Sequence, residues 1–160
     1  MRSRRGTTAV EFAIAAIPFL VLLIGIIELA WQFTTAAALD AAVLRASRFG
    51  ITGQATIAGE PAQYTCRSQT ISWMISNSTG GFLKPANLTV SIQSYGNASD
   101  LTAGTPVAGA GNGGQIVTYS VTYTQPFLTG AWINLIGGSP VLTHRANIVV
   151  KNEPFDDATC

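Results

Sequence analysis

The sequence predicts an α+β protein in which a long N-terminal helix leaves a membrane and is followed by a small head with one short helix and a three-stranded antiparallel sheet. An almost uncharged apolar run occupies residues 12–33, and three later stretches alternate apolar and polar residues. Charged residues make up only 11% of the 160 residues, against roughly 25% in soluble domains. Part of the chain is therefore expected to lie outside water.

The apolar run at residues 12–33 is predicted to cross the membrane as a helix. At about 1.5 Å per residue it covers roughly 33 Å, which matches the hydrocarbon thickness of a bilayer. Its only charged residue is Glu28, which is close enough to the far end to reach lipid headgroups. Arginines precede the run at positions 2, 4 and 5, and the next basic residue is Arg45. Because positive flanks stay in the cytoplasm, the N-terminus is predicted inside and the rest of the chain outside.

The same segment has an alternative interpretation as an ordinary secretory signal. The basic start and the apolar run are followed by alanines at positions 36–38, which fit a small-residue cleavage site. This alternative makes the protein a secreted or membrane-anchored periplasmic ligand-binding module. Retention in the membrane is preferred, because the run exceeds the roughly 7 to 15 apolar residues of such a signal.

The helix is predicted to continue past the membrane as a stalk, so that residues 7–53 form one transmembrane and stalk helix. Alanines are frequent after the span, and Leu39, Val43 and Ala46 recur at helical spacing. This stripe predicts packing against another element. Gly53 supplies a stop signal.

The head is assigned to residues 54–160. Apolar residues at helical spacing within 60–79 predict one short helix that ends at the following glycine pair. Residues 88–95, 116–124 and 144–152 each alternate with a period of two, which predicts three strands with one buried face. The sheet is expected to pack against the short helix.

Two connections in the head differ in composition. Residues 96–114 are rich in glycine, alanine and asparagine and are predicted to form a mobile hairpin loop. Residues 126–140 are apolar, and their burial over the sheet is predicted because a small head needs core. The alternative is an exposed docking patch, with Phe127, Trp132 and Ile136 as possible partner contacts.

No catalytic, metal or cofactor site is recognisable. His144 is the only histidine, and no cysteine or carboxylate lies close to it in sequence. The glycine-rich residues 109–114 lack the preceding strand and following helix of a phosphate-binding loop. A net charge of +1 gives no reason to expect nucleic acid. The prediction is a protein that is not an enzyme and has no catalytic residue, metal, cofactor or small-molecule substrate; an anchored hydrolase that uses His144 is the open alternative.

The two cysteines, Cys66 and Cys160, both fall outside the membrane in this topology, where disulfides form. A bridge between them would close a loop of about 95 residues and contribute roughly 4 to 5 kcal/mol in the chain-entropy model. An intermolecular bridge and free thiols are the alternatives.

Glu11 stands at the start of the apolar run, and two explanations account for it. In the first, Thr8 and Glu11 form a capping box, in which Thr8 caps the helix and Glu11 reaches back to its amide. A carboxylate in the first turn also suits the helix dipole.

In the second explanation, Glu11 and Gly6 belong to one sequence motif. Arg4-Arg5-Gly6 followed by TTAVEF and an apolar helix resembles the class III signal of type IV pilins. The resemblance implies that a prepilin peptidase cuts after Gly6, that residues 1–6 are a leader peptide, and that Thr7 becomes the new N-terminus. It also implies that Glu11 pairs with the N-terminal amine of a neighbouring subunit during assembly. Such pairing would offset part of the cost of a charge in lipid, about 2.5 to 3.5 kcal/mol.

More of the sequence resembles one family. RRGTTAVEFAIAAIPFLVLLIGIIELAWQF, its continuation AALDAAVLRASRFG, and the ending ANIVVKNEPF are similar to TadE-like proteins, which are minor pseudopilins of the tight adherence pilus. The resemblance implies a non-enzymatic assembly or priming subunit in the bacterial inner membrane, with its head in the periplasm. It also implies other Tad pilins, a second minor pseudopilin and the prepilin peptidase as partners.

Overall fold

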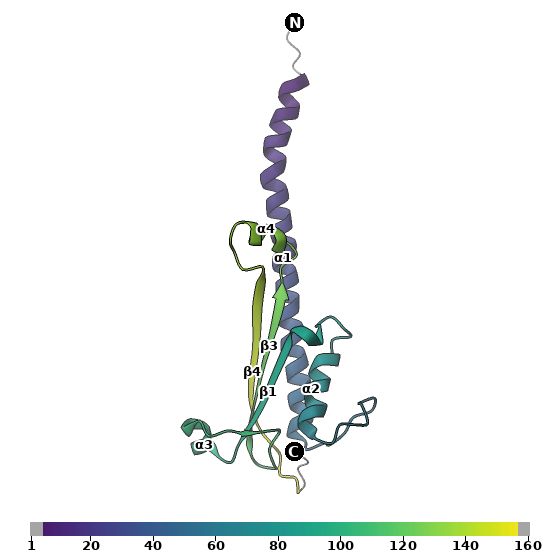
Figure 1. Cartoon of the computed structure of the whole chain (residues 1–160), viewed down its shortest axis with the longest axis vertical. Helices are drawn as coiled ribbons and strands as arrows, with labels where there is room; N and C mark the ends of the chain where they lie inside the picture. The colour runs from purple at the N-terminus through teal and green to yellow at the C-terminus, as the bar shows by residue number, and fades with distance from the viewer. Residues whose placement is uncertain (1–4, 157–160) are drawn as a thin grey trace.

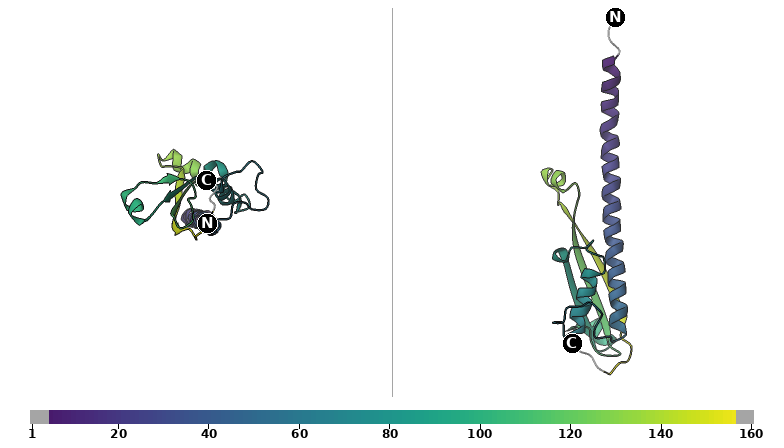
Figure 2. Two further views of the ribbon diagram at one scale, coloured as in Figure 1. Left: turned by 90° about the horizontal axis from the view of Figure 1, so that it is seen from below. Right: turned by 90° about the vertical axis from the view of Figure 1, so that its right-hand side faces the viewer.

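The computed structural model describes residues 5–156, with side chains from residue 8 onward. The N-terminal half of the first helix projects as a rod, and the other elements gather around its C-terminal half (Figures 1 and 2). In chain order the elements are α1 (Arg5–Ile51), α2 (Arg67–Asn77), the 3-10 helix η1 (Pro85–Asn87), β1 (Leu88–Tyr95), α3 (Ala98–Ala103), β2 (Val107–Ala108), β3 (Ile116–Pro126), α4 (Gly130–Leu135) and β4 (Val141–Lys151). The predicted order of a long apolar helix, then a head with a helix and an antiparallel sheet, is confirmed.

The two halves of α1 differ in exposure. Its apolar side chains are exposed from Val10 to Leu29, whereas Leu39, Val43 and Ala46 are buried in the head. The stripe predicted from their spacing is therefore confirmed. A single continuous helix thus supplies both the exposed rod and one wall of the core.

Gly50 allows the last turn of α1 to approach the sheet closely. A Cβ atom at this position would collide with the hydroxyl group of Tyr119 and lie 3.3 Å from Cδ1 of Ile71. Tyr119 and Ile71 are both fully buried, so neither can move aside into water.

Gly50→Ala is expected to lower the free energy of unfolding by about 1 to 3 kcal/mol through overpacking, offset in part by the better helix propensity of alanine. Gly25→Ala is the matched control, because it makes the same change in the same helix where nothing lies within 4 Å. Denaturation of the full chain in detergent micelles, followed by circular dichroism, compares them. Equal stabilities of the two variants would contradict the predicted clash.

The sheet has four strands in the order β2-β1-β3-β4, all antiparallel, so the predicted number of three is wrong. The three predicted strands are present as β1, β3 and β4. The additional strand, β2, is only two residues long and pairs Val107 with Ser94 and Ala108 with Gln93. A two-residue strand is too short to produce a period-two pattern in the sequence.

Residues 96–114 are also more structured than a loop. They contain α3, whose N-cap residue Asn97 accepts a hydrogen bond from the backbone N–H of Asp100 at 3.0 Å, and then β2. Ala110 is fully buried. The segment does connect the antiparallel strands β1 and β3, as the predicted hairpin loop requires, but it also contains a short helix and a strand that pairs with the edge of β1.

The core lies between one face of the sheet and the two helices α1 and α2. Four alternate residues of β3 are buried there, as their spacing predicts: Val117, Tyr119, Val121 and Tyr123. They pack in one cluster with Leu39 of α1 and with Ile71 and Ile75 of α2. The helix α2 begins at Arg67, inside the predicted range of 60–79, because Gln69 Oε1 accepts the backbone N–H of Cys66 at 3.1 Å and caps the helix there.

The connection between β3 and β4 is not buried over the sheet, contrary to the preferred prediction. It carries α4 and projects from the head toward the exposed half of α1 (Figure 1). Four of its large apolar side chains are exposed, namely those of Leu128, Trp132, Leu135 and Ile136, whereas those of Phe127 and Ile133 are half-buried. The face of the sheet that could have buried them is already filled by α1 and α2, so the alternative of an exposed patch describes this segment.

Candidate functional site: the N-terminal helix and its junction with the head

The first half of α1 presents an apolar surface on every side. Exposed side chains include those of Phe12, Ile17, Leu22 and Ile27. In the part of the chain that the structure describes, one helix is long and apolar enough to cross a membrane, and it is the N-terminal one. A helix that is apolar all round and uncovered by its own chain is suited to lipid or to other helices. This surface is the first part of the candidate site.

The predicted processing residues lie at the start of the same helix. Helix α1 begins at Arg5, so Gly6 and Thr7 have helical backbone, while the side chain of Thr7 is not among those described. Thr8 lies inside the helix of the uncut chain and not at the N-cap position that the predicted capping box requires. Glu11 follows within the first two turns and is exposed. Its carboxylate is therefore open to another chain.

Glu28 joins α1 to the head. Its Oε2 accepts hydrogen bonds from the backbone N–H of Thr129 at 3.1 Å and from the Thr129 hydroxyl at 3.3 Å. Only 8% of Glu28 is exposed. The expectation that it reaches lipid headgroups is wrong, because the side chain turns toward the hairpin between β3 and β4.

Gln32 and His144 extend this contact along the next turn. Gln32 lies four residues after Glu28 and donates its Nε2–H to Glu28 Oε1 at 3.1 Å. With its nitrogen used in this way, the amide oxygen of Gln32 accepts from His144 Nε2, which is 2.9 Å away. This arrangement places a proton on Nε2 of His144. We call Glu28, Gln32, Thr129 and His144 the junction cluster.

The junction cluster was not predicted, although the sequence contains one indication of it. Glu28 and Gln32 are two polar residues four apart within an apolar helix, a spacing that places them on one face. Their partner Thr129 is 101 residues away in the chain. No local pattern marks such a partner.

Partial burial of His144 should make the stability of the head sensitive to acid. Burial lowers the pKa of His144 from its ordinary value of 6.5. The unfolded chain then binds a proton more readily than the folded chain, so the free energy of unfolding decreases as the pH falls below about 6.5. We expect thermal stability to decrease from pH 7 toward about pH 5, measured on the full chain in micelles.

His144→Gln is the control for this pH effect. Glutamine keeps an N–H donor for Gln32 but does not titrate in this range. Carboxylates contribute equally to both proteins, so the difference between their pH profiles isolates His144. Parallel profiles for the two proteins would contradict a role for this histidine.

The predicted cysteine pair is only partly described. Cys66 is the N-cap residue of α2 and is not a free thiol. Cys160 lies outside the described residues, so the pairing of the two stays a prediction.

Arg67, next to Cys66, is a buried cation. Its Nη2 donates to the carbonyl oxygens of Ala110, at 2.7 Å, and Gly111. The guanidinium lies 4.6 Å from the ring centroid of Phe155, a cation–π contact. Burial lowers the pKa of Arg67 and raises the pKa of the neighbouring Tyr119 to about 12. These contacts fasten the segment after β2 and the end of the chain to α2.

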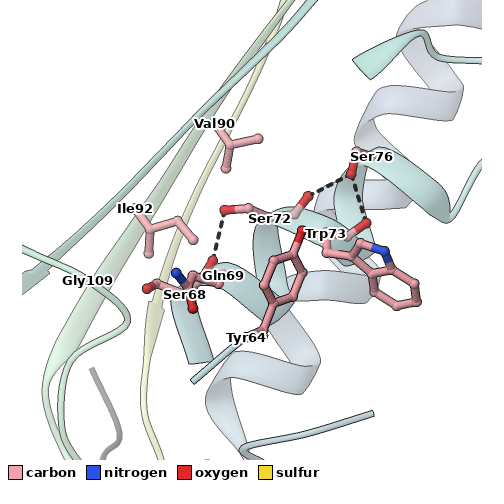
Figure 3. A pocket seen from close by; sticks show the side chains of 9 residues that line it. All are labelled: Tyr64, Ser68, Gln69, Ser72, Trp73, Ser76, Val90, Ile92 and Gly109. Atoms are coloured by element: carbon pink, nitrogen blue, oxygen red, sulfur yellow. Dashed lines mark hydrogen bonds between the residues drawn. The ribbon is translucent and has the colours of Figure 1, made fainter. Parts of the chain in front are cut away.

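A groove of about 450 Å³ runs between α2 and β1 (Figure 3). Its aromatic walls are Tyr64 and Trp73, and a row of serines lies along one face of α2. The hydroxyl of Ser72 donates to the carbonyl oxygen of Ser68 at 2.8 Å, and the hydroxyl of Ser76 donates to the carbonyl oxygen of Trp73 at 2.9 Å. None of the nine lining residues is charged. The groove therefore offers stacking surfaces and hydroxyl oxygens, and no acid or base.

Residues that could hold a metal do not come together in the described part of the chain, where no group of three or more histidine, cysteine, aspartate or glutamate residues forms. Among the described residues, the hydrogen-bond partner of the His144 side chain is the amide of Gln32. Its position is explained by the junction cluster.

Comparison with known proteins adds one match. Residues 6–48 match the family model of TadE-like proteins. The range starts at Gly6, includes Glu11, Glu28 and Gln32, and ends in the buried half of α1. The resemblance stated for the N-terminal block is confirmed for these residues. No curated protein matches the chain, and no solved structure matches it.

Proposed function

We propose, because residues 6–48 are TadE-like, that the chain is a non-enzymatic minor pseudopilin that takes part in assembly or priming of a Tad pilus. The observation that carries the proposal is the coincidence of this match with an apolar helix that its own head leaves uncovered. A subunit that bundles with other pilins needs such a free helical surface. The anchor would be a single pass through the bacterial inner membrane, with the N-terminus in the cytoplasm and the head in the periplasm.

Cleavage after Gly6 by a prepilin peptidase is the first step of this function. It would remove the leader, residues 1–6, with its arginines, and leave a single positive charge on the amine of Thr7. That amine is four residues from Glu11. After cleavage the helix would begin next to Thr8, so that the capping role predicted for Thr8 becomes available only in the mature chain.

The exposed carboxylate of Glu11 is then the group that meets the N-terminal amine of a neighbouring subunit. A carboxylate in lipid without a partner costs about 2.5 to 3.5 kcal/mol on insertion scales, and an ion pair offsets part of that cost. Register between neighbouring helices would follow from this pairing. The head would contact other minor subunits, including a second minor pseudopilin.

Mass spectrometry of the mature protein from native membranes tests the processing step. The expected N-terminus is Thr7, and a Gly6 variant such as Gly6→Leu should retain the leader. Gly25→Ala is a control for substitution of a glycine elsewhere in α1 and should be cut normally. A mature protein that begins at Met1, or at Leu39 as an ordinary signal would give, is incompatible with the proposal.

The charge of Glu11 is tested by Glu11→Gln, which keeps a hydrogen-bonding side chain and removes the charge. We expect a strong loss of assembled pili in a cell that expresses only the variant. Asp40→Asn is the matched control, because Asp40 is an exposed carboxylate on the same helix beyond the span. Normal piliation by Glu11→Gln would remove the pairing role.

The groove between α2 and β1 supports a second candidate function, a periplasmic ligand-binding module. Aromatic walls beside hydroxyl groups are typical of sites for small polar ligands. Cell fractionation separates a secreted module from a pseudopilin, since a cleaved secretory signal gives soluble protein. For an anchored module, Trp73→Ala should abolish ligand binding and leave piliation unchanged.

A further inference from the structure

The hairpin between β3 and β4 exposes several large apolar side chains. We call residues 126–142 the hairpin tip. Its side chains Trp132, Leu135 and Ile136 are 73%, 77% and 84% exposed, compared with 75% for Phe12 on the apolar rod of α1. The tip carries no charge, and no charged residue occurs between Asp100 and Arg145. By exposure and composition it resembles the membrane-spanning part of α1.

The junction cluster holds the hairpin tip at the level of the apolar span. Thr129 of the tip is bonded to Glu28, which lies five residues before Phe33, the end of the apolar run. At about 1.5 Å per residue, that contact is roughly 7 Å inside the span. Figures 1 and 2 show the tip reaching farther along α1 than any other part of the head.

Apart from Glu28, which is buried against Thr129, the charged residues near the hairpin tip are basic. Arg145 is exposed on β4 directly after His144, which is hydrogen-bonded to Gln32 near the end of the span. Lys84 lines one cavity together with Leu128 of the tip and Trp31 of α1. Acidic residues are absent from residues 61–99 and 101–152. Along α1 the next acid after Glu28 is Asp40, roughly 18 Å farther from the span.

We propose that the hairpin tip is a second membrane contact, seated in the leaflet from which α1 emerges. Trp132, Leu135 and Ile136 lie among the upper acyl chains, and Arg145 and Lys84 lie at the level of the lipid phosphates. Tryptophan is favoured at this depth because it is apolar with one polar edge. The inference rests on the membrane span of α1 and not on the pilus role.

A lipid surface fits the hairpin tip better than another protein does, because the tip lies beside the apolar rod of α1. The tip and the span share one level along α1, so a bilayer that covers the span also reaches the tip. Basic residues beside an apolar wedge complement anionic headgroups. The head would then be fixed in tilt and rotation relative to the membrane by two contacts instead of one.

Depth-dependent fluorescence quenching tests the proposal with the full chain in vesicles of phosphatidylcholine and phosphatidylglycerol. Trp31→Phe with Trp73→Phe leaves Trp132 as the only tryptophan. Acyl chains brominated near the headgroup are expected to quench most of its emission, and the emission should lie at shorter wavelength than that of tryptophan in water. Ile136→Asp added to this protein should reduce the quenching, whereas Val149→Asp should not, since Val149 is an exposed apolar residue of β4 away from the tip.

Two single-tryptophan controls separate the possible outcomes. A protein with only Trp73, which lies on α2 in the head, should not be quenched. A protein with all three tryptophans replaced and Phe19→Trp introduced should be quenched strongly, because it reports the span itself. Quenching of the Phe19→Trp protein without quenching of Trp132 overturns the proposal while the anchor stands. A short emission wavelength for Trp132 without lipid quenching also overturns it, in favour of a second copy of the chain. Absence of quenching in all proteins overturns the span and the proposal together.

Discussion

Replacing Glu28 with alanine should release the hairpin between β3 and β4 from α1. The substitution removes the acceptor of three hydrogen bonds, from the Thr129 amide, the Thr129 hydroxyl and Gln32. Hydrogen bonds to a charged group contribute about 1.5 to 3 kcal/mol, and a buried donor left without a partner costs a similar amount. We expect a loss of about 2 to 4 kcal/mol in the stability of the docked hairpin.

Hydrogen exchange followed by mass spectrometry measures this change locally. Since about 1.4 kcal/mol corresponds to a factor of ten, the amide of Thr129 should exchange roughly 30 to 1,000 times faster in the Glu28→Ala protein. Two graded controls are available. Glu28→Gln keeps one acceptor oxygen and should fall between the extremes, and Thr129→Val removes only the weaker hydroxyl bond. Unchanged exchange at Thr129 in the alanine variant would show that the junction cluster does not hold the hairpin.

Loss of the predicted bridge between Cys66 and Cys160 should have an effect of similar size on the whole head. Closing a loop of about 95 residues gives a stabilisation of roughly 4 to 5 kcal/mol in the chain-entropy model, and removal of natural disulfides from small domains costs about 2 to 5 kcal/mol. Cys66→Ser is therefore expected to lower the thermal midpoint strongly, because the native free energy of unfolding of a small domain is only about 5 to 15 kcal/mol.

The pairing itself is checked by peptide mapping under non-reducing conditions. A linked peptide that contains both cysteines is expected, and it should separate on reduction. The double variant with both cysteines replaced by serine should be as unstable as each single variant, since the bridge is one interaction. A disulfide-linked dimer would instead support the intermolecular alternative, and free thiols with full stability would exclude any structural bridge.

Periodicity predicted the elements that have a long repeat on one buried face. The stripe of Leu39, Val43 and Ala46 is buried as predicted, and so is the alternate set from Val117 to Tyr123 in β3. In both cases apolar residues recur at the spacing that places them on one face. This spacing indicates a buried face even when the element that packs against it is unknown. Strand β2 has two residues and no repeat, and for that reason it was missed.

Periodicity did not predict contacts between residues that are far apart in the sequence. Composition indicated that residues 126–140 are apolar, but not that α1 and α2 would already occupy the face of the sheet on which they were expected. The position of Glu28 near the end of the apolar run predicts contact with lipid headgroups, whereas its hydrogen-bond partner in the structure is Thr129. The family resemblance in turn pointed to Gly6 and Glu11, whose proposed roles in processing and assembly involve other proteins and leave no contact within one chain to read.

Because α1 supplies both the exposed rod and one wall of the core, a soluble fragment of the head cannot begin at the end of this helix. A fragment that starts at residue 54 would lack Leu39, Val43 and Ala46, and the inner faces of β3 and α2 would be left facing water. A soluble version of the head should therefore begin near residue 34 and retain the lower turns of the helix. The composition change near residue 53 marks where helical sequence stops, and an autonomous folding unit starts some twenty residues before it.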